Sequence, residues 1–540
     1  MENMKRASGI LLPVSSLPSP YGIGTFSREA YEFVDFLAAA GQTYWQILPL
    51  GPTGYGDSPY QSFSTFAGNP YYIDPEELIE KGWITKKDCE SYDWGDTDGY
   101  VDYEKIYLSR FRLLKKAFLE SKIEEDEEFQ SFVKENEYWL IDYAMYMAVK
   151  DHFKGVNWLS WDEDIRNRDE KAMKKYREEL TEEILFYEFQ QYLFASQWLR
   201  LKKYANEKGV LIVGDIPIYV AFDSADTWAN PELFQLNEKG EPVAVAGCPP
   251  DAFSATGQLW GNPLYRWDYH AQTGFAWWMK RIGYCYKLYD VVRIDHFRGF
   301  DEYYSIPYGD PTAEFGKWEK GPGYALFKTM KEQIGNKPVI AEDLGFLTPS
   351  VIRLVKKTGY PGMKILQFAF DSREESDYLP HNYTANSVVY TGTHDNDTTL
   401  GWYHTIPACD RRFAKNYLNI KGNKKVTWEF IRAAIASVSD TAIIPMQDYL
   451  ELGSEARINT PSTLGDNWKW RMSAEQLSPE LAEEILELCK LYGRVKDRKK
   501  KRRLWKKAGK SQRRIRKDQE KYREKKELQK RRKRDGRWEK

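Results

Sequence analysis

Eight short apolar segments recur along the chain, and stretches with the polar and apolar periodicity of amphipathic helices separate them. The segments are Gly9–Leu17, Tyr44–Leu50, Val210–Pro217, Val291–Phe297, Val339–Asp343, Met363–Phe370, Ser387–Asp395 and Thr441–Asp448. Continuous apolar runs that alternate with helical patterns are typical of buried parallel strands. Eight strand–helix units therefore predict an α/β fold of the (β/α)8 TIM-barrel type.

The first strand–helix–strand unit carries the clearest local signals. Ser27 is a favourable helix start, Gly41 a favourable helix end, and the next apolar run begins at Tyr44. These are the start and stop residues expected of a helix that connects two parallel strands.

Two long segments interrupt the repeating pattern, one after the second predicted strand and one after the third. Residues 76–208 are mostly charged and helix-periodic, which predicts a helical insertion together with the helix before the third strand. Residues 221–267 have no regular pattern, and a loop of this length in a compact domain is usually functional. We therefore expect one barrel domain over residues 1–493 that contains both insertions, and a separate tail over residues 494–540.

The formal net charge of −1 hides a sharp division along the chain. Residues 494–540 hold 26 Lys and Arg against 7 Asp and Glu, whereas the first 493 residues hold 53 basic and 73 acidic side chains. An acidic body disfavours nucleic acid as the main ligand, and a neutral substrate is unaffected by it. The tail either binds RNA or another anionic surface or is a solvated, partly helical or disordered extension, and we favour the extension.

The spacing of the cysteines and the hydropathy of the chain indicate the cellular compartment of the protein. The five cysteines show no pairwise spacing, so they predict neither a disulfide framework nor a zinc site. The apolar run near the N-terminus is too short for a secretory signal, and no stretch reaches the ~20 apolar residues of a membrane span. We expect a soluble, cytoplasmic protein.

The segment from Val291 to Gly299 changes abruptly from apolar to charged. Because side chains alternate along a strand, Arg293 and Asp295 leave it on the same side. A guanidinium in that position would hold the carboxylate ionised, as a nucleophile requires. The alternative is a purely structural Arg–Asp pair at the end of a strand.

Acidic residues recur at the C-terminal ends of the predicted strands, namely Asp215, Asp295, Glu342 and Asp395. In a barrel these ends converge on one face, where four carboxylates would repel one another unless the chemistry needs them. Enzymes that cleave glycosidic bonds typically use one ionised and one protonated carboxyl group. Asp295 beside Arg293 suits the nucleophile, and Glu342, without an adjacent cation, suits the proton donor.

Short motifs around these residues resemble a known family. The segments Arg293-Ile294-Asp295-His296, Ala341-Glu342-Asp343 and Thr393-His394-Asp395-Asn396-Asp397 resemble the signature segments of the α-amylase clan. The segments Ser58-Pro59-Tyr60-Gln61-Ser62, Ser224-Ala225-Asp226 and Gly257-Gln258-Leu259-Trp260-Gly261-Asn262-Pro263 are similar to those of the 4-α-glucanotransferases of glycoside hydrolase family 77, also called amylomaltases or disproportionating enzymes. The resemblance covers about residues 8–490.

The resemblance implies roles for the charged residues. Asp295 would be the catalytic nucleophile, Glu342 the general acid/base, and Asp395 the carboxylate that stabilises the transition state through sugar hydroxyls. Arg293 and His394 would support these charges.

It also implies residues that bind the sugar. Tyr60 and Trp260 would be sugar platforms, although the tyrosines of the loop around Tyr60 could instead pack that loop down. Asp215 would line the site or be partly structural. His296 would either touch sugar at an acceptor subsite or pack below it.

The implied activity is transfer of a segment of an α-1,4-glucan to the 4-OH of another glucan or glucose, by a retaining double displacement. The partners would be maltodextrins and fragments of starch or glycogen, with no cofactor and no metal. An amylase-type hydrolase would use the same residues. A non-catalytic glucan-binding barrel would be expected to lack one of the three carboxylates, yet all three are present.

Overall fold

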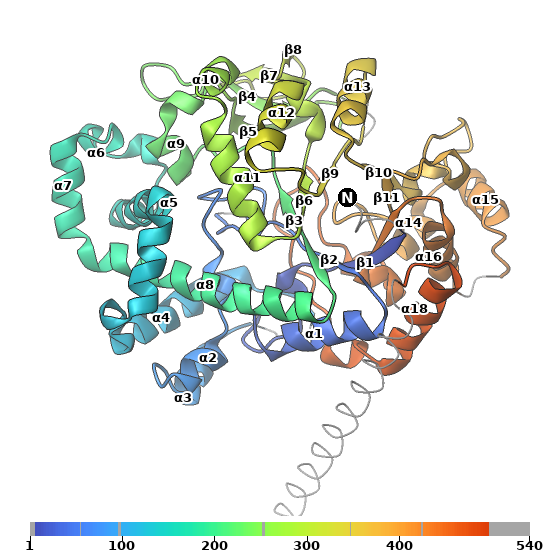
Figure 1. The fold of residues 1–540 in the computed structure, drawn as a ribbon, viewed down its shortest axis with the longest axis horizontal. Helices are drawn as coiled ribbons and strands as arrows, with labels where there is room; N and C mark the ends of the chain where they lie inside the picture. Colours follow the sequence, from blue (N-terminus) through green and yellow to red (C-terminus); the bar gives the residue numbers. More distant parts are fainter. Residues whose placement is uncertain are drawn as a thin grey trace, which may run out of the picture.

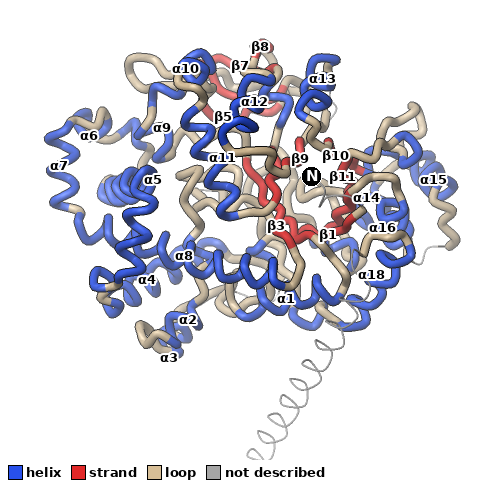
Figure 2. Tube along the Cα trace, in the orientation of Figure 1, coloured by secondary structure: helices blue, strands red, loops and turns tan. Residues whose placement is uncertain are grey.

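The computed structural model describes residues 6–495, apart from residues 55, 96–98, 251–253, 346 and 423–424. Eight parallel strands form one sheet in the order β10-β11-β12-β1-β2-β3-β6-β9. They are β1 (Ala7–Leu11), β2 (Tyr44–Gln46), β3 (Leu211–Ile216), β6 (Val291–Ile294), β9 (Val339–Ala341), β10 (Gly362–Ile365), β11 (Ser387–Tyr390) and β12 (Thr441–Pro445). The Ala341 N–H donates to Pro361 O at 3.0 Å where the two outermost strands meet, and Figure 2 shows the strands curving round a common axis. The predicted (β/α)8 barrel is confirmed.

The interior of the barrel is filled by side chains from all eight strands. They include Leu11, Tyr44, Val213, Val291, Ile340, Met363, Val388 and Ile443. Gly9 lies where a Cβ atom would come within 2.6 Å of the Cβ of Tyr44, so no larger residue fits there. Because this core is packed, a ligand site must lie above it, at the ends of the strands.

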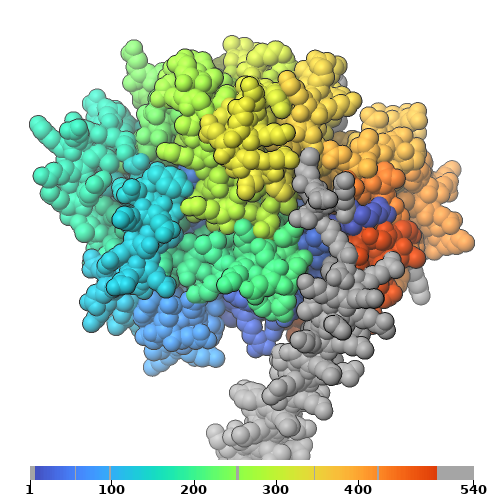
Figure 3. Space-filling model, in the orientation of Figure 1, coloured from blue at the N-terminus to red at the C-terminus, as the bar shows by residue number. Residues whose placement is uncertain are grey.

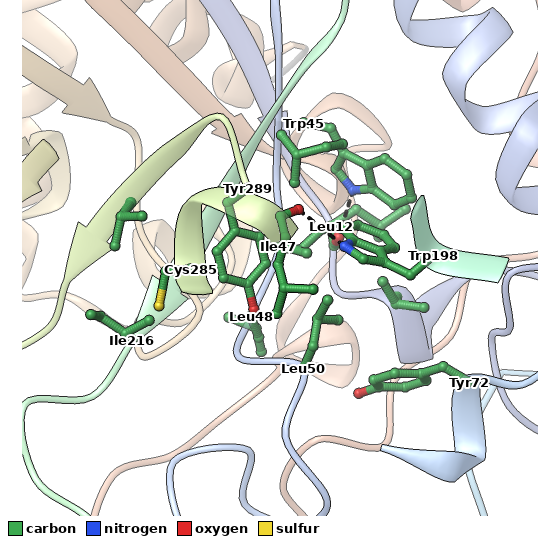
Figure 4. Packing of buried hydrophobic residues seen from close by; sticks show 14 of the residues in the cluster. Leu12, Trp45, Ile47, Leu48, Leu50, Tyr72, Trp198, Ile216, Cys285 and Tyr289 are labelled. Carbon is green, nitrogen blue, oxygen red and sulfur yellow. Dashed lines mark hydrogen bonds between the residues drawn. The ribbon is translucent and has the colours of Figure 1, made fainter. Parts of the chain in front are cut away.

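Helices surround the barrel (Figure 1). Those outside the insertions are α1 (Arg28–Ala39), α11 (Ala276–Leu288), α12 (Tyr324–Gln333), α13 (Pro349–Thr358), α14 (Thr399–Thr405), α15 (Ala408–Tyr417), α16 (Val426–Ala436), α17 (Met446–Tyr449) and α18 (Pro479–Leu491). Figure 4 shows how a helix packs on the strands: Trp198 lies beside Trp45, whose indole N–H donates to the carbonyl of Leu12 at 2.9 Å. Both indoles are fully buried.

The segment between β2 and β3 carries only helices among its described residues. They are α2 (Pro75–Glu80), α3 (Lys86–Glu90), α4 (Tyr103–Ser121), α5 (Glu127–His152), α6 (Glu163–Arg166), α7 (Glu170–Glu179) and α8 (Thr181–Glu207). In Figures 1 and 3 these blue-to-cyan elements form the left side of the molecule, and α8 runs back beneath the barrel. The proposed division into domains stays a prediction.

The segment 221–267 has regular structure, so the prediction that it lacks such structure is wrong. It contains α9 (Ala225–Ala229), β4 (Ala244–Cys248), β5 (Gln258–Pro263) and the start of α10 (Trp267–Gln272). These two strands join β7 (Glu302–Pro307) and β8 (Lys317–Lys320) in an antiparallel sheet of order β5-β4-β7-β8. The partner strand β7 lies far along the chain, so no local pattern announces the pairing.

Arg494, which the charge pattern places in the tail, is fully buried. Its guanidinium donates to the carbonyls of Ile435 and Ala7, at 2.6 and 2.8 Å, and makes longer contacts with four more. Val495 is buried as well. The fold thus continues through Val495, and the rest of the predicted basic tail, residues 496–540, lies outside the described residues.

No helix in the described part of the chain is long and apolar enough to cross a membrane.

Candidate active site

Arg293, on β6, connects two carboxylates at the end of the barrel. Its Nη1 lies 2.6 Å from Oδ2 of Asp215, and its Nη2 lies 3.0 Å from Oδ1 of Asp295. Arg293 and Asp215 are buried, whereas the Asp295 side chain is 28% exposed. The Arg293–Asp295 pair expected from the sequence is therefore present, and Arg293 has a second, unpredicted partner in the buried Asp215.

Glu342 follows directly after β9 and is held by two backbone amides. The N–H of His296 donates to Oε2 at 2.7 Å, and the N–H of Leu344 donates to Oε1 at 3.0 Å. Burial raises the pKa of Glu342, while Arg293 and the two amides oppose the rise. A proton on this carboxyl group is available for donation at higher pH than on an exposed glutamate.

The pKa of Asp295 also differs from the expectation that Arg293 simply keeps it low. Burial raises this pKa, and Arg293 opposes the rise while Glu342, Asp215 and Asp395 add to it. Arg293 also pairs with Asp215, so its charge is shared between two carboxylates. Because Glu342 is among the groups that raise the pKa of Asp295, these two carboxyl groups interact as they titrate.

Asp395 lies beyond the end of β11 and has both oxygens occupied. Its Oδ2 lies 3.3 Å from Nε2 of His394, and its Oδ1 accepts from the side-chain amide of Asn459 at 2.6 Å. Arg457 donates to the Asp395 carbonyl at 2.8 Å. Asn459 and Arg457 were not predicted, because they come from an irregular segment after β12 in which no motif marks them.

Tyr60 joins the same network from the loop after β2. Its hydroxyl lies 2.8 Å from Oδ2 of Asp215 and 2.9 Å from Nε2 of His394, and its ring stacks on His394 with centroids 5.3 Å apart. Burial lowers the pKa of His394. Because the Tyr60 hydroxyl donates to Asp215, the hydrogen bond between Tyr60 and His394 requires that the Nε2–H of His394 donates to the Tyr60 oxygen.

Trp260, on β5, covers His296. The two rings meet edge to face, with centroids 4.8 Å apart and planes at 86°. Gln61 donates to the Trp260 carbonyl at 3.4 Å, which ties this strand to the Tyr60 loop. Burial lowers the pKa of His296 to about 3, so this imidazole is uncharged at neutral pH. Tyr219 is a further unpredicted neighbour, with its ring 6.2 Å from that of Trp260.

Contacts join the nine residues that the sequence singled out into two groups. One group is Tyr60, Asp215, Arg293, Asp295, His394 and Asp395, and the other is Trp260, His296 and Glu342. Glu342 raises the pKa of Asp295, so the two groups interact electrostatically. Chemically, the arrangement offers one carboxylate paired with a cation, one carboxyl group poised to give a proton, and a third carboxylate fixed beside them.

The sequence profile of the family described as 4-alpha-glucanotransferase matches residues 12–477. A 4-alpha-glucanotransferase of Clostridium butyricum is 51% identical over 483 residues, which are 89% of this chain and 99% of that protein. One of Thermus thermophilus is 49% identical over 488 residues, covering 88% of this chain and 97% of that protein.

Solved structures agree with these matches. The amylomaltase from Streptococcus agalactiae in complex with acarbose superposes with a TM-score of 0.89 at 45% identity, covering 91% of this chain and 100% of that one. The amylomaltase from Corynebacterium glutamicum, at 19% identity and a TM-score of 0.71, covers 91% of this chain and 75% of that one and supports the fold. On the family profile and these relatives, the chain belongs to the 4-α-glucanotransferases, glycoside hydrolase family 77.

Proposed function

We propose that this 4-α-glucanotransferase works by a retaining double displacement in which Asp295 is the nucleophile and Glu342 the general acid/base. The observation that carries the proposal is the contrast between the two groups. Asp295 has a guanidinium 3.0 Å away, whereas among the described residues no cation lies within ion-pair distance of Glu342. One ionised and one protonated carboxyl group are what the first step needs.

In the first step, Asp295 attacks the anomeric carbon of an α-1,4-glucan. A bond forms between Oδ of Asp295 and that carbon, the glycosidic bond breaks, and Glu342 gives its proton to the departing 4-oxygen. In the second step, Glu342 takes the proton from the 4-OH of an incoming glucan, which displaces Asp295. One glycosidic bond is broken and one is made, so the cycle consumes no cofactor.

Asp395, in this proposal, stabilises the transition state through hydroxyls of the same sugar. Its orientation is supported by Asn459 and by His394. Arg293 shares its charge between Asp215 and Asp295, so Asp215 acts mainly by holding the guanidinium.

Tyr60, Trp260 and His296 would form the apolar walls of the sugar site. Trp260 lies on β5, which Gln61 links to the loop of Tyr60, so the two proposed platforms are held together. These walls would exclude water while holding an acceptor, and this balance would decide between transfer and hydrolysis.

The donors and acceptors that we propose are maltodextrins and fragments of starch or glycogen. An acarbose complex of the Streptococcus agalactiae relative supports a site of this kind. The five cysteines form no disulfide bond in the described part of the chain, which agrees with the reducing cytoplasm that we propose.

Incubation with pure maltotriose tests the proposal. Transfer yields glucose together with a ladder of oligosaccharides longer than maltotriose. Products that are all shorter than maltotriose would make the protein an amylase-type hydrolase instead.

A further inference from the structure

The chain turns sharply at His296, directly after the proposed nucleophile. His296 has φ 50° and ψ 50°, in the left-handed region that residues other than glycine rarely adopt. Such a conformation persists only where the surrounding structure enforces it, and it is concentrated at functional sites. The strand was expected to run on to Phe297, but it ends at Ile294.

This turn wraps the backbone around Glu342. The Glu342 N–H donates to Ile294 O at 3.1 Å, and the Phe297 N–H donates to Glu342 O at 3.0 Å. Between them, the His296 N–H donates to the side-chain Oε2 of Glu342 at 2.7 Å. In a continuing parallel ladder the His296 N–H would point toward β9, as that of Val292 does, and would donate to a main-chain carbonyl there. The turn at His296 brings the Phe297 N–H to Glu342 O instead, which leaves the His296 N–H for the carboxyl group of Glu342.

The imidazole of His296 has different neighbours from its amide. It packs edge to face on Trp260 and lies 6.4 Å from the ring of Tyr219, centroid to centroid. A Cβ atom at Gly299 would come within 3.2 Å of Cδ2 of His296, so glycine makes room for the ring. Its Nε2 is buried and has no hydrogen-bond partner in the described part of the chain. The imidazole of His296 therefore contacts Trp260 on β5, whereas the main-chain N–H of His296 contacts Glu342.

We propose that His296 is a positioning residue for Glu342, acting through its backbone amide: the left-handed turn gives the Phe297 N–H to the Glu342 carbonyl, which leaves the His296 N–H for Oε2 and so fixes the orientation of the proton donor. The inference rests on the proposed function, in which Glu342 is the general acid/base. The imidazole has the separate task of supporting Trp260.

Loss of the hydrogen bond from the His296 N–H to Glu342 would raise the pKa of Glu342. The charged and titratable groups that face Glu342 are Arg293 from β6, Asp295 just after it, Asp343 from its own loop, and Tyr378. An N–H that donates to a carboxylate favours its ionised form, so removing that N–H raises the pKa of Glu342.

The test compares substitutions that keep the left-handed turn with one that does not. His296→Gly and His296→Asn adopt positive φ readily, whereas the β-branched side chain of His296→Val opposes it. Each variant is assayed for kcat on maltotriose as a function of pH, and for the burst of fluoride released from α-maltosyl fluoride. Fluoride leaves without a proton from Glu342, so the burst reports attack by Asp295 alone.

We expect His296→Val to lose about 10- to 100-fold in kcat on maltotriose, which is less than the roughly 100- to 10,000-fold contribution of general acid–base catalysis because Glu342 itself remains. Its basic limb should move to higher pH, and its fluoride burst should stay within about 3-fold of wild type. His296→Gly and His296→Asn should keep the wild-type basic limb and most of kcat. Their loss should appear in the KM for the acceptor, because the support for Trp260 is gone.

Lys122→Val is the matched control. Lys122 also has a positive φ, 48°, and is exposed between α4 and the turn that follows. This variant should lower the melting temperature and leave the pH profile unchanged. If His296→Val does not fold, His296→Ala takes its place, and its basic limb must still lie above that of wild type.

Two results would overturn the proposal. One is a loss of kcat in His296→Gly as large as in His296→Val, which would assign the effect to the imidazole. The other is an unmoved basic limb in a folded His296→Val or His296→Ala. Failure of the proposed function looks different, because wild type itself would then give no oligosaccharides longer than maltotriose.

Discussion

The side-chain amide of Asn459 donates to Oδ1 of Asp395 at 2.6 Å, joining residues from two different strand ends. The same segment holds the backbone around Asp395, since the Asn459 N–H donates to His394 O at 3.1 Å and Arg457 donates to Asp395 O at 2.8 Å. With His394 beside its other oxygen, Asp395 is fixed before any sugar arrives. Preorganisation of this kind favours the transition state.

Replacing Asn459 by Ala should therefore lower kcat. Loss of a hydrogen bond to a charged group costs about 1.5–3 kcal/mol, which corresponds to roughly a 10- to 100-fold decrease in rate. Asn467→Ala is a control in the same segment, because the amide of Asn467 donates only to Thr460 and Thr463. A value of kcat for Asn459→Ala equal to that of Asn467→Ala would argue against a role for this contact.

Arg293→Lys should impair the site although it keeps the charge. A lysine ammonium is a single point and cannot contact Asp215 and Asp295 with the separate nitrogens that the guanidinium provides. We expect a loss of about 2–4 kcal/mol in transition-state stabilisation, or roughly 30- to 1,000-fold in kcat/KM. Steady-state kinetics with maltotriose measures it, and activity within about 3-fold of wild type would contradict the bridging role.

The pH dependence follows from the raised pKa of Glu342. Because Glu342 must be protonated and Asp295 ionised in the first step, kcat should pass through a maximum with pH and should fall on the basic side as the pH rises through the raised pKa of Glu342. The same group destabilises the folded protein as pH rises from the unfolded pKa, near about 4.3, through the folded one. The melting temperature of Glu342→Gln relative to wild type should therefore increase across that window, and a constant difference would contradict a raised pKa.

The last buried residues of the fold should matter more than the basic segment beyond them. Arg494 donates to backbone carbonyls of α16, β1 and the start of β12, so Arg494→Ala should cost roughly 2–4 kcal/mol in the free energy of unfolding. Arg28→Ala, whose partner Glu32 is on the surface, should cost under about 1 kcal/mol. Denaturant unfolding distinguishes the two.

Truncation gives a second test of the same boundary. A chain that ends after Val495 should keep its stability and its transfer activity, whereas one that ends after Gly493 should lose stability. Equal stability of the two truncated chains would show that Arg494 and Val495 are dispensable.

The barrel was predictable because its strands are buried on both faces. Continuous apolar runs such as Val210–Val213 are typical of strands covered on both sides, and the acidic residue at the end of four of these runs marks the open end of the barrel. Asp215, Asp295, Glu342 and Asp395 could thus be assigned to one face without any knowledge of their distances.

What the sequence did not reveal depends on partners that are remote along the chain. The strands β4 and β5 form a sheet only together with β7 and β8, which come later in the chain. Asn459 belongs to an irregular segment, and its contact with Asp395 is visible in the structure but not in the sequence. The left-handed turn at His296 is equally hidden, because histidine rather than glycine occupies it. Arg494 was assigned wrongly to the tail because a buried arginine at the edge of a charge run has no distinguishing mark in the sequence.

The central claim is that Asp295 forms the covalent bond to the sugar. Treating Glu342→Gln with α-maltosyl fluoride should trap that bond, because fluoride leaves without an acid and no general base remains to activate an acceptor. Mass spectrometry of the digested protein should then find one maltosyl group on the peptide that contains Asp295. A maltosyl group on another residue, or full release of fluoride with no adduct at any time, would contradict the account.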